Sequence, residues 1–320
     1  MGKQKGNIME DKTESCANLV VDIIIPVYKP APEFKNILKR LLKQTVPANH
    51  IYLLQTLDNG SSLMDGLAEG IISVHPVLKK EFDHGATRRF GAGLSDAEFM
   101  LFMTQDAIPK DNRLIEKLLV PMSDKNIAVS YGRQMAGKDA DILEKMTRIY
   151  NYPKESSVKS GNDLDRLGIK TYFCSDVCAM YRKSVYEELG GFVKKTIFNE
   201  DMIMASKVIN AGYNIAYCAE AKVIHSHSYT CIQQFKRNFD LGVSQKQYSE
   251  IFGNISSEKE GAGYAGKIIK SLIKRGEVFK AFYFVLQCVF KLAGYKAGLH
   301  YDKLPEKLIL KCTMNKGYWD

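Results

Sequence analysis

Acidic residues follow two apolar runs of the sequence, at positions where a sheet presents side chains to a ligand. Asp58 follows residues 51–57, and Asp106 follows residues 98–103. Ligands of open α/β sheets bind outside the carboxyl ends of the strands. A carboxylate there can hydrogen-bond a base or a ribose, or hold a divalent cation against diphosphate charge. The alternative at both positions is a turn or helix-capping role, which Asn-Gly-Ser after Asp58 also favours.

Two residue pairs have the types needed for proton transfer or metal binding. Glu200 and Asp201 open a segment with helical pattern at 198–211. The helix dipole partly explains two acids in a first turn, but in a cleft Asp201 can take a proton from a hydroxyl. His225 and His227 follow a short apolar run. This spacing is compatible with a metal ligand and a neighbouring group, or with two histidines satisfied in a polar loop.

One arginine pair suggests a binding role, whereas one cysteine pair suggests only a structural role. Arg88 and Arg89 fall in the first turn of a helix predicted over 85–94, where the dipole disfavours cations. This local cost favours a phosphate-binding role for Arg88 over simple tolerance. Cys174 and Cys178 lack a second cysteine pair for zinc, so we expect core thiols. The seven cysteines are thinly spread and residues 1–18 contain no apolar leader segment, so we expect a reducing cytosol.

Apolar runs and helical spacing alternate along the first part of the chain. The sequence predicts strands at 20–27, 51–57, 71–75 and 98–103, with helices at 34–42 and 85–94. This alternation predicts an α/β fold with an open, mostly parallel, Rossmann-like sheet flanked by helices. Further strands are predicted at 127–132, 173–181, 213–217 and 221–224, and helices at 198–211 and 229–251. Residues 135–172 show little periodic pattern.

The formal net charge of +9 is concentrated near the C-terminus. Residues 262–320 contain eleven lysines and arginines against four acidic residues. A basic surplus suits nucleic acid, an anionic membrane or a phosphorylated substrate. Because residues before 262 are almost neutral, we expect no nucleic-acid partner. The sequence predicts three parts: a flexible N-terminus (1–19), an α/β domain (20–255) and a basic helical C-terminal segment (256–320), joined by a polar, glycine-containing connector at 256–263.

The C-terminal segment contains an apolar stretch at 278–294 that carries Lys280, Gln287 and Lys291. Its longest run without charge, 281–290, is shorter than the roughly 20 residues that span a bilayer. We therefore expect a basic amphipathic helix on an anionic membrane surface, where each base adds about 1 kcal/mol. The alternative is a helix that packs on the α/β domain and keeps a solvated basic face.

Seven short motifs, in this order, resemble family 2 glycosyltransferases. They are Ile-Ile-Ile-Pro-Val-Tyr at 23–28, Asp-Asn-Gly-Ser at 58–61, His-Gly-Ala-Thr-Arg-Arg at 84–89, Thr-Gln-Asp at 104–106, Glu-Leu-Gly-Gly-Phe at 188–192, Asn-Glu-Asp at 199–201 and His-Ser-His at 225–227. The resemblance covers residues 21–248. The Thr-Gln-Asp and His-Ser-His forms, with Phe-Lys-Arg-Asn-Phe-Asp-Leu-Gly at 235–242, resemble the bacterial rhamnosyltransferase branch that builds O-antigen or capsule.

The resemblance implies a GT-A fold, with residues 20–255 as its catalytic domain, and inverting transfer of a sugar from a nucleotide-diphosphate donor. We expect L-rhamnose from dTDP-rhamnose, a saccharide or lipid-linked saccharide acceptor, and Mn²⁺ or Mg²⁺. The implied roles are nucleotide-sugar binding by Pro26, Val27, Tyr28 and Gln105, base binding by Asp58, base or diphosphate binding by Arg88, donor and metal binding by Asp106, metal ligation by His225, a diphosphate or acceptor contact by His227, and general-base catalysis by Asp201 beside Glu200.

One position departs from the family pattern, in which an acidic residue usually stands two positions before the final aspartate of the metal motif. That position is Thr104, so the sequence is also compatible with weak metal binding. It is compatible as well with a UDP-hexose or UDP-N-acetylhexosamine transferase of the same fold, and with a catalytically silent nucleotide-sugar-binding protein. We expect a cytoplasmic protein, peripheral at the inner face of the cell membrane.

Overall fold

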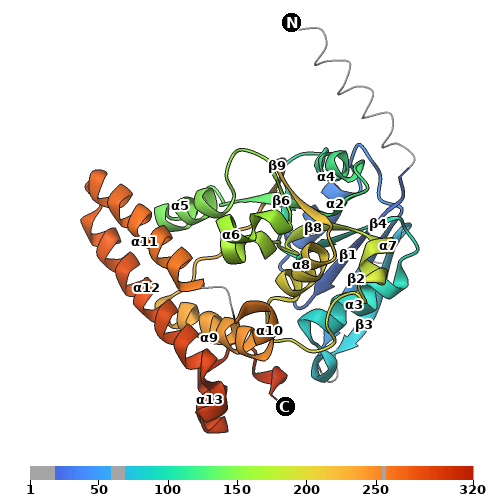
Figure 1. Cartoon of the computed structure of the whole chain (residues 1–320). Helices are drawn as coiled ribbons and strands as arrows, with labels where there is room; N and C mark the ends of the chain where they lie inside the picture. The colour runs from blue at the N-terminus through green and yellow to red at the C-terminus, as the bar shows by residue number, and fades with distance from the viewer. Residues whose placement is uncertain (1–18, 59–68, 254–256, 320) are drawn as a thin grey trace, which may run out of the picture.

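A single mixed sheet forms the centre of the molecule. The computed structural model describes residues 19–58, 69–253 and 257–319 (Figure 1). Residues 1–18 of the predicted flexible N-terminus and residues 59–61 of the motif after Asp58 therefore lie outside the described part. The strands, in chain order, are β1 (Val21–Val27), β2 (His50–Leu57), β3 (Ile72–Leu78), β4 (Phe99–Met103), β5 (Ile108–Pro109), β6 (Ile127–Met135), β7 (Ser157–Lys159), β8 (Cys178–Arg182) and β9 (Asn214–Ile224).

The order of the strands brings the carboxyl ends of all the mutually parallel strands to one edge of the sheet. The spatial order is β3-β2-β1-β4-β8-β6-β9-β5, with β7 paired to β9. Strands β1 to β4 are parallel, β8 is antiparallel to both β4 and β6, and β9 is parallel to β6. Strands β1, β4, β6 and β9 therefore run in the same direction, and the residues that follow them meet at one edge.

Helices cover both faces of the sheet. Alternate residues of a strand face opposite sides, and β1 accordingly contributes Ile23 and Ile25 to one hydrophobic cluster and Ile24 to the other. The first cluster includes α2 and α4, and the second includes α3, α7 and α8 (Figure 1). The helices are α2 (Phe34–Leu41), α3 (His84–Leu94), α4 (Leu114–Met122), α5 (Ile142–Asn151), α6 (Leu164–Leu167), α7 (Lys183–Glu188), α8 (Glu200–Asn210), α9 (Cys231–Gln247), α10 (Ser249–Phe252), α11 (Ser257–Lys274), α12 (Val278–Leu299) and α13 (Glu306–Cys312).

The structure corrects two strand predictions. The strand expected at 173–181 begins only at Cys178, because residues 173–175 are irregular and residues 176–177 form a turn, after a 3₁₀ helix at 168–172. Cys174 therefore precedes the strand, although both it and Cys178 are buried thiols, as predicted. The two strands expected at 213–217 and 221–224 are one strand, β9. Its pairing with β6 shifts between Cys218 and Lys222, so a bulge interrupts the alternating pattern without ending the strand.

The C-terminal helices pack on the rest of the chain. The connector expected at 256–263 is helical from Ser257 onward, as part of α11. Residues of α11 and α12 share a hydrophobic cluster with Leu143 of α5. Helix α12 lies along α9, and a Cβ added to Gly294 would stand 2.1 Å from the Phe235 carbonyl oxygen. The glycines thus allow a close approach of two backbones, and Figure 1 shows α11 and α12 side by side next to α5 and α9.

Helix α12 is, among the described residues, the one helix long and apolar enough to cross a membrane by length and composition. It has 22 residues, and 22% of its most apolar window is buried. We expected Lys280 and Lys291 to exclude a membrane span, so composition and charge pattern point in different directions. In the structure, α12 combines close packing along α9 with a large exposed apolar surface.

Candidate active site

A cleft of about 520 Å³ opens at the carboxyl ends of β1, β4 and β6, beside the N-terminus of α8. Every site residue predicted from the sequence lines this cleft except Asp58. The predicted residues that line it are Pro26, Val27, Tyr28, Arg88, Gln105, Asp106, Glu200, Asp201, His225 and His227. The structure thus brings together residues that are up to two hundred positions apart in the chain.

The loops after β1 and β4 are joined at the mouth of the cleft. The Tyr28 backbone N–H donates to Gln105 Oε1 at 2.7 Å, and Gln105 Nε2 donates to the Tyr28 carbonyl oxygen at 3.0 Å. The Tyr28 hydroxyl lies 3.2 Å from the Asp58 carboxylate, which also pairs with Lys29 at 2.7 Å and Lys79 at 2.8 Å. Hydrogen bonds from these two lysines hold the pKa of Asp58 well below its usual range. Asp58 is therefore linked to the cleft through Tyr28.

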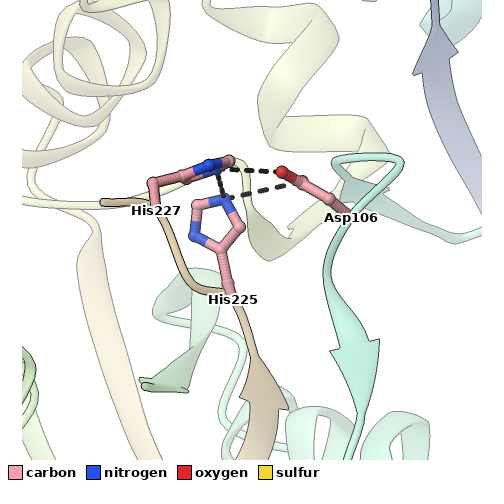
Figure 2. A group of neighbouring side chains, drawn as sticks. All are labelled: Asp106, His225 and His227. Atoms are coloured by element: carbon pink, nitrogen blue, oxygen red, sulfur yellow. Dashed lines mark hydrogen bonds and ion pairs between the residues drawn. The ribbon is translucent and has the colours of Figure 1, made fainter. Parts of the chain in front are cut away.

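Asp106, His225 and His227 converge on one point (Figure 2). Their candidate ligand atoms all lie within 4.8 Å of one another. His227 Nε2 is 2.9 Å from Asp106 Oδ2 and 2.8 Å from His225 Nε2, while His225 Nε2 is 3.5 Å from Asp106 Oδ1. His227, which the sequence placed near the diphosphate or acceptor, thus belongs to the same cluster as the predicted metal ligands.

Surrounding groups prepare this cluster for a cation. His225 Nδ1 lies 2.9 Å from Gln134 Oε1, an acceptor that also receives a hydrogen bond from Arg148. With a proton on Nδ1, that acceptor would be satisfied and Nε2 could offer its lone pair to a cation, the arrangement common in metal-ligating histidines. Burial lowers the pKa of His225, which favours the neutral imidazole needed for ligation.

Burial would raise the pKa of Asp106, but hydrogen bonds from the two histidines outweigh it and hold that pKa well below its usual range. One carboxylate and two imidazoles suit a divalent ion such as Mn²⁺.

The second group of the cleft is the carboxylate pair at the start of α8. Glu200 and Asp201 form its first turn, as predicted. Asn199 does not cap this helix with its side chain; it adopts a left-handed conformation with φ +66°, and its Nδ2 lies 3.4 Å from Ser244 Oγ. This turn directs the N-terminus of α8 into the cleft.

The two carboxylates have different electrostatic surroundings. Arg88, only 5% exposed, places Nη1 at 3.0 Å from Glu200 Oε1. Burial would raise the pKa of Glu200, but Arg88 outweighs it and lowers that pKa. Burial and the neighbouring Glu200 charge raise the pKa of Asp201 to about 7. In the described residues Asp201 forms no ion pair. Asp201 is therefore the carboxylate that can exchange a proton near neutral pH.

Three charged residues of the cleft were missed from the sequence. Asp176 lies in the loop before β8, accepts a hydrogen bond from the Tyr181 hydroxyl at 2.7 Å, and has a pKa that burial and Asp201 raise well above its usual value. Arg148 comes from α5, inside the stretch that showed little pattern, and Arg237 from α9, inside a motif that carried no assigned role. Sequence gives no contact information for such residues. Arg88 is ion-paired with Glu200 and lies 3.6 Å from Asp176, and its contact with base or diphosphate stays a prediction.

Comparison with solved structures identifies the fold. The chain resembles the mannosyltransferase PcManGT from Pyrobaculum calidifontis, solved with GDP-Man and Mn²⁺, at a TM-score of 0.59 and 12% identity, over 93% of this chain and 95% of that one. It also resembles S. aureus TarS 1–349 with UDP, at a TM-score of 0.51 and 13% identity, over 89% and 91% of the two chains. These likenesses confirm the expected GT-A fold.

Comparison with related sequences identifies the family of this chain. The O-antigen chain rhamnosyltransferase RfbN of Salmonella typhimurium is 38% identical over 94% of this chain and 96% of its own length. The O-antigen chain rhamnosyltransferase WbaN of Salmonella anatum is 37% identical over 93% and 95%. Residues 22–190 match the family model described as glycosyl transferase family 2. The chain therefore belongs to glycosyltransferase family 2.

Proposed function

We propose that this protein is an inverting, metal-dependent rhamnosyltransferase of cell-surface polysaccharide synthesis, acting on an O-antigen precursor. The donor in this proposal is dTDP-L-rhamnose, and the acceptor is a saccharide or lipid-linked saccharide. The observation that carries it is a single cleft lined both by a proton-accepting carboxylate, Asp201, and by the Asp106, His225 and His227 cluster. Two O-antigen chain rhamnosyltransferases that align with nearly the whole chain support the choice of sugar and pathway.

Asp201 serves as the general base of the proposed reaction. Its carboxylate removes the proton from the acceptor hydroxyl as that oxygen attacks the anomeric carbon from the face opposite the nucleotide. A pKa of about 7 matches this task, because the group is ionised in part at neutral pH and still basic enough to take a proton. Glu200 stays ionised through Arg88, and its negative charge keeps the proton affinity of Asp201 high. Arg88 and Glu200 thus act as positioning residues for Asp201.

The donor binds to residues that follow β1 and β4. Pro26, Val27 and Tyr28 lie against the nucleotide, Gln105 holds the Tyr28 backbone, and Asp58 contacts the base through the group it forms with Tyr28. Asp106, His225 and His227 would hold Mn²⁺ or Mg²⁺, which when bound neutralises charge on the departing diphosphate. The second histidine replaces the acidic residue that the family usually has at the position of Thr104.

The C-terminal helices provide the membrane contact of this proposal. Phe279 and Phe282 of α12 are 93% and 73% exposed, and Lys280 follows Phe279 in a segment rich in lysine and arginine. Apolar side chains beside bases suit an anionic leaflet at the cytoplasmic face of the membrane. The double variant Phe279→Glu, Phe282→Glu should lose flotation with phosphatidylglycerol vesicles, whereas Val120→Glu on α4 should retain it. Flotation equal to wild type in the double variant would refute this contact.

A donor screen tests the reaction. Thermal shift with Mn²⁺ should show stabilisation by dTDP-rhamnose that exceeds stabilisation by UDP-glucose and UDP-N-acetylglucosamine. Proton NMR of the product should show an anomeric configuration opposite to that of the donor. Stronger stabilisation by a UDP-sugar would show that the donor is that UDP-sugar and not dTDP-rhamnose. A product with the same anomeric configuration as the donor would overturn the inverting mechanism. Donor binding without any release of nucleoside diphosphate, with or without acceptor, would instead identify a silent nucleotide-sugar-binding protein.

A further inference from the structure

A second pocket of about 400 Å³ lies beside the active-site cleft, between α5, α9 and α12. We call it the α12 pocket. It shares Arg148, Asn151, His227, Tyr229 and Arg237 with the cleft, so the two are continuous. A ligand that fills the α12 pocket therefore reaches the group of residues around the proposed metal site and base.

Helix α12 supplies the outer wall of this pocket. Tyr283, Gln287 and Lys291 line it and recur every four residues, so they share one face of the helix. Gln287 is buried, and its Nε2 lies 3.5 Å from the Tyr229 carbonyl oxygen. This wall lies close to α9, and the approach depends on Gly298 having no side chain. A Cβ at that position would stand 2.1 Å from the Phe239 carbonyl oxygen. These three residues lie outside residues 22–190, the stretch that matches the family model.

The charges of the pocket are unbalanced. Three cations, Arg148, Arg237 and Lys291, line it, and within the described residues none of them is ion-paired with a carboxylate. Two acids are present, and one oxygen of each accepts from a neighbouring donor. Asp141 Oδ1 accepts from the Glu144 backbone N–H at 2.7 Å, which caps α5. Glu144 Oε1 accepts from the Ser226 hydroxyl at 2.6 Å and the His227 backbone N–H at 3.0 Å. Arg148 also donates to Gln134 Oε1, so Arg237 and Lys291 are the cations available to an anionic ligand.

The ligand is also expected to contain hydroxyl groups. Glu144 Oε2 is buried without a hydrogen-bond partner, on the side of the pocket that adjoins His227. Thr147, Asn151 and Gln234 add further polar groups to the lining. A saccharide hydroxyl that donates to Glu144 would satisfy its free oxygen. The pocket therefore offers hydroxyl acceptors together with two arginines that it shares with the cleft and one lysine from α12.

We propose that the α12 pocket binds the acceptor as a lipid diphosphate saccharide, with Lys291 and Arg237 contacting the diphosphate and the sugar directed toward Asp201. The proposal rests on the glycosyltransferase function proposed above, and it names the charged group of the acceptor. The lipid chain leaves along α12, where Phe279, Phe282 and Leu286 are exposed. Lys291 and Arg237 both line the pocket, and burial together with the charge of Arg237 lowers the pKa of Lys291.

Binding of lipid diphosphate probes to the full chain tests this assignment. The donor site is first saturated with dTDP and Mn²⁺, or with UDP and Mn²⁺ where the donor screen selects a UDP-sugar. Calorimetry then measures farnesyl diphosphate, inorganic pyrophosphate and farnesol. We expect farnesyl diphosphate to bind at least tenfold more tightly than either of the others. Equal binding of pyrophosphate would show a site for free diphosphate, and equal binding of farnesol a purely apolar site; either result overturns the proposal.

Two matched lysines of α12 locate the contact. Lys291→Gln should weaken farnesyl diphosphate binding at least fivefold and raise the acceptor KM without changing the donor KM. Lys280→Gln is the control, because Lys280 is exposed, pairs with Glu277 at 3.0 Å and does not line the pocket. Equal effects of both variants would overturn the assignment of Lys291. Thermal unfolding of Lys291→Gln without ligand should match that of wild type, so that lost binding is not lost folding.

The proposed function and the pocket assignment fail in different ways. If dTDP-rhamnose does not bind but farnesyl diphosphate binding depends on Lys291, the donor proposal is wrong and the pocket assignment stands. The other outcome is that the protein hydrolyses dTDP-rhamnose, but Lys291→Gln changes neither farnesyl diphosphate binding nor the acceptor KM. The pocket assignment is then wrong and the donor proposal stands.

Discussion

Arg88 Nη1 lies 3.0 Å from Glu200 Oε1, and this ion pair distinguishes Glu200 from its neighbour Asp201. The two carboxylates occupy the same helical turn, yet Arg88 lowers the pKa of Glu200, whereas burial and the Glu200 charge raise that of Asp201 to about 7. Adjacent acids with separated pKa values are a common sign of divided catalytic roles.

The substitution Asp201→Asn should abolish sugar transfer while leaving nucleotide binding nearly intact. The amide keeps the size of the side chain but cannot accept the hydroxyl proton, and general-base assistance is worth about 10²–10⁴ in rate. Product formation measures the first effect and calorimetry with the nucleotide the second. Wild-type turnover in this variant would remove Asp201 from the mechanism.

The rate of transfer should rise with pH and level off above about 7. Asp201 is protonated below its pKa of about 7 and then cannot act as a base, so the ionised fraction sets the rate. A profile of kcat between pH 5 and 9 measures this. A rate independent of pH below 7 would contradict the raised pKa.

The same pKa predicts a change in stability. Folded Asp201 holds its proton up to about pH 7, whereas the unfolded group loses it near 3.8. Between these values the folded state binds more protons, so the Asp201 contribution to the free energy of unfolding falls as pH rises. Asp201→Asn removes this loss, and its melting temperature relative to wild type should therefore be higher at pH 8 than at pH 4.5. A constant difference across this range would contradict the linkage.

Replacement of Arg88 by Gln should destabilise the fold by about 3–5 kcal/mol, because it leaves buried Glu200 and Asp176 without their cation. The loss should be smaller at pH 5, where the unpaired carboxylates take up protons. Chemical denaturation at pH 5 and 8 measures both values. Arg166→Gln is the control: Arg166 is exposed and pairs with Asp163 at the surface, so its removal should change stability by less than about 1 kcal/mol.

Removal of a predicted metal ligand should weaken metal-dependent nucleotide binding. Asp106→Ala and His227→Ala each take one ligand from the cluster, and we expect at least tenfold weaker nucleotide binding in Mn²⁺ but little change in EDTA. His300→Ala, at an exposed position after α12, should behave as wild type. If wild-type protein binds the nucleotide equally well with and without metal, the cluster has no metal role in donor binding.

Packing of α12 on α9 should be sensitive to one methyl group. Gly294→Ala forces a Cβ to within 2.1 Å of the Phe235 carbonyl oxygen, so the helices must separate and the melting temperature should fall. Gly266→Ala on α11 meets no atom within 4 Å and should be neutral or stabilising, because alanine favours helix by about 1 kcal/mol. Equal melting temperatures of the two variants would contradict the close packing.

The sequence by itself determined the alternating strands and helices from β1 to β4, because burial on both faces leaves continuous apolar runs and crossover helices leave a 3.6-residue period. It also determined that Asp106 follows a strand and that Glu200 and Asp201 open a helix, since these are local features. Local pattern failed at β9, where a bulge looks like a strand end, and in the segment before β8, where buried residues form a turn.

Only the tertiary structure decided which residues share the site. The antiparallel insertion of β8 brings Asp176 beside Arg88, and the order of β4, β6 and β9 brings His227 to Asp106. The tertiary structure also determined where the basic C-terminal segment packs. The segment lies against α5 and α9, and Lys291 lies beside the cleft. Contacts between distant positions depend on strand order and helix packing, and these physical relationships leave no periodic trace in a single sequence.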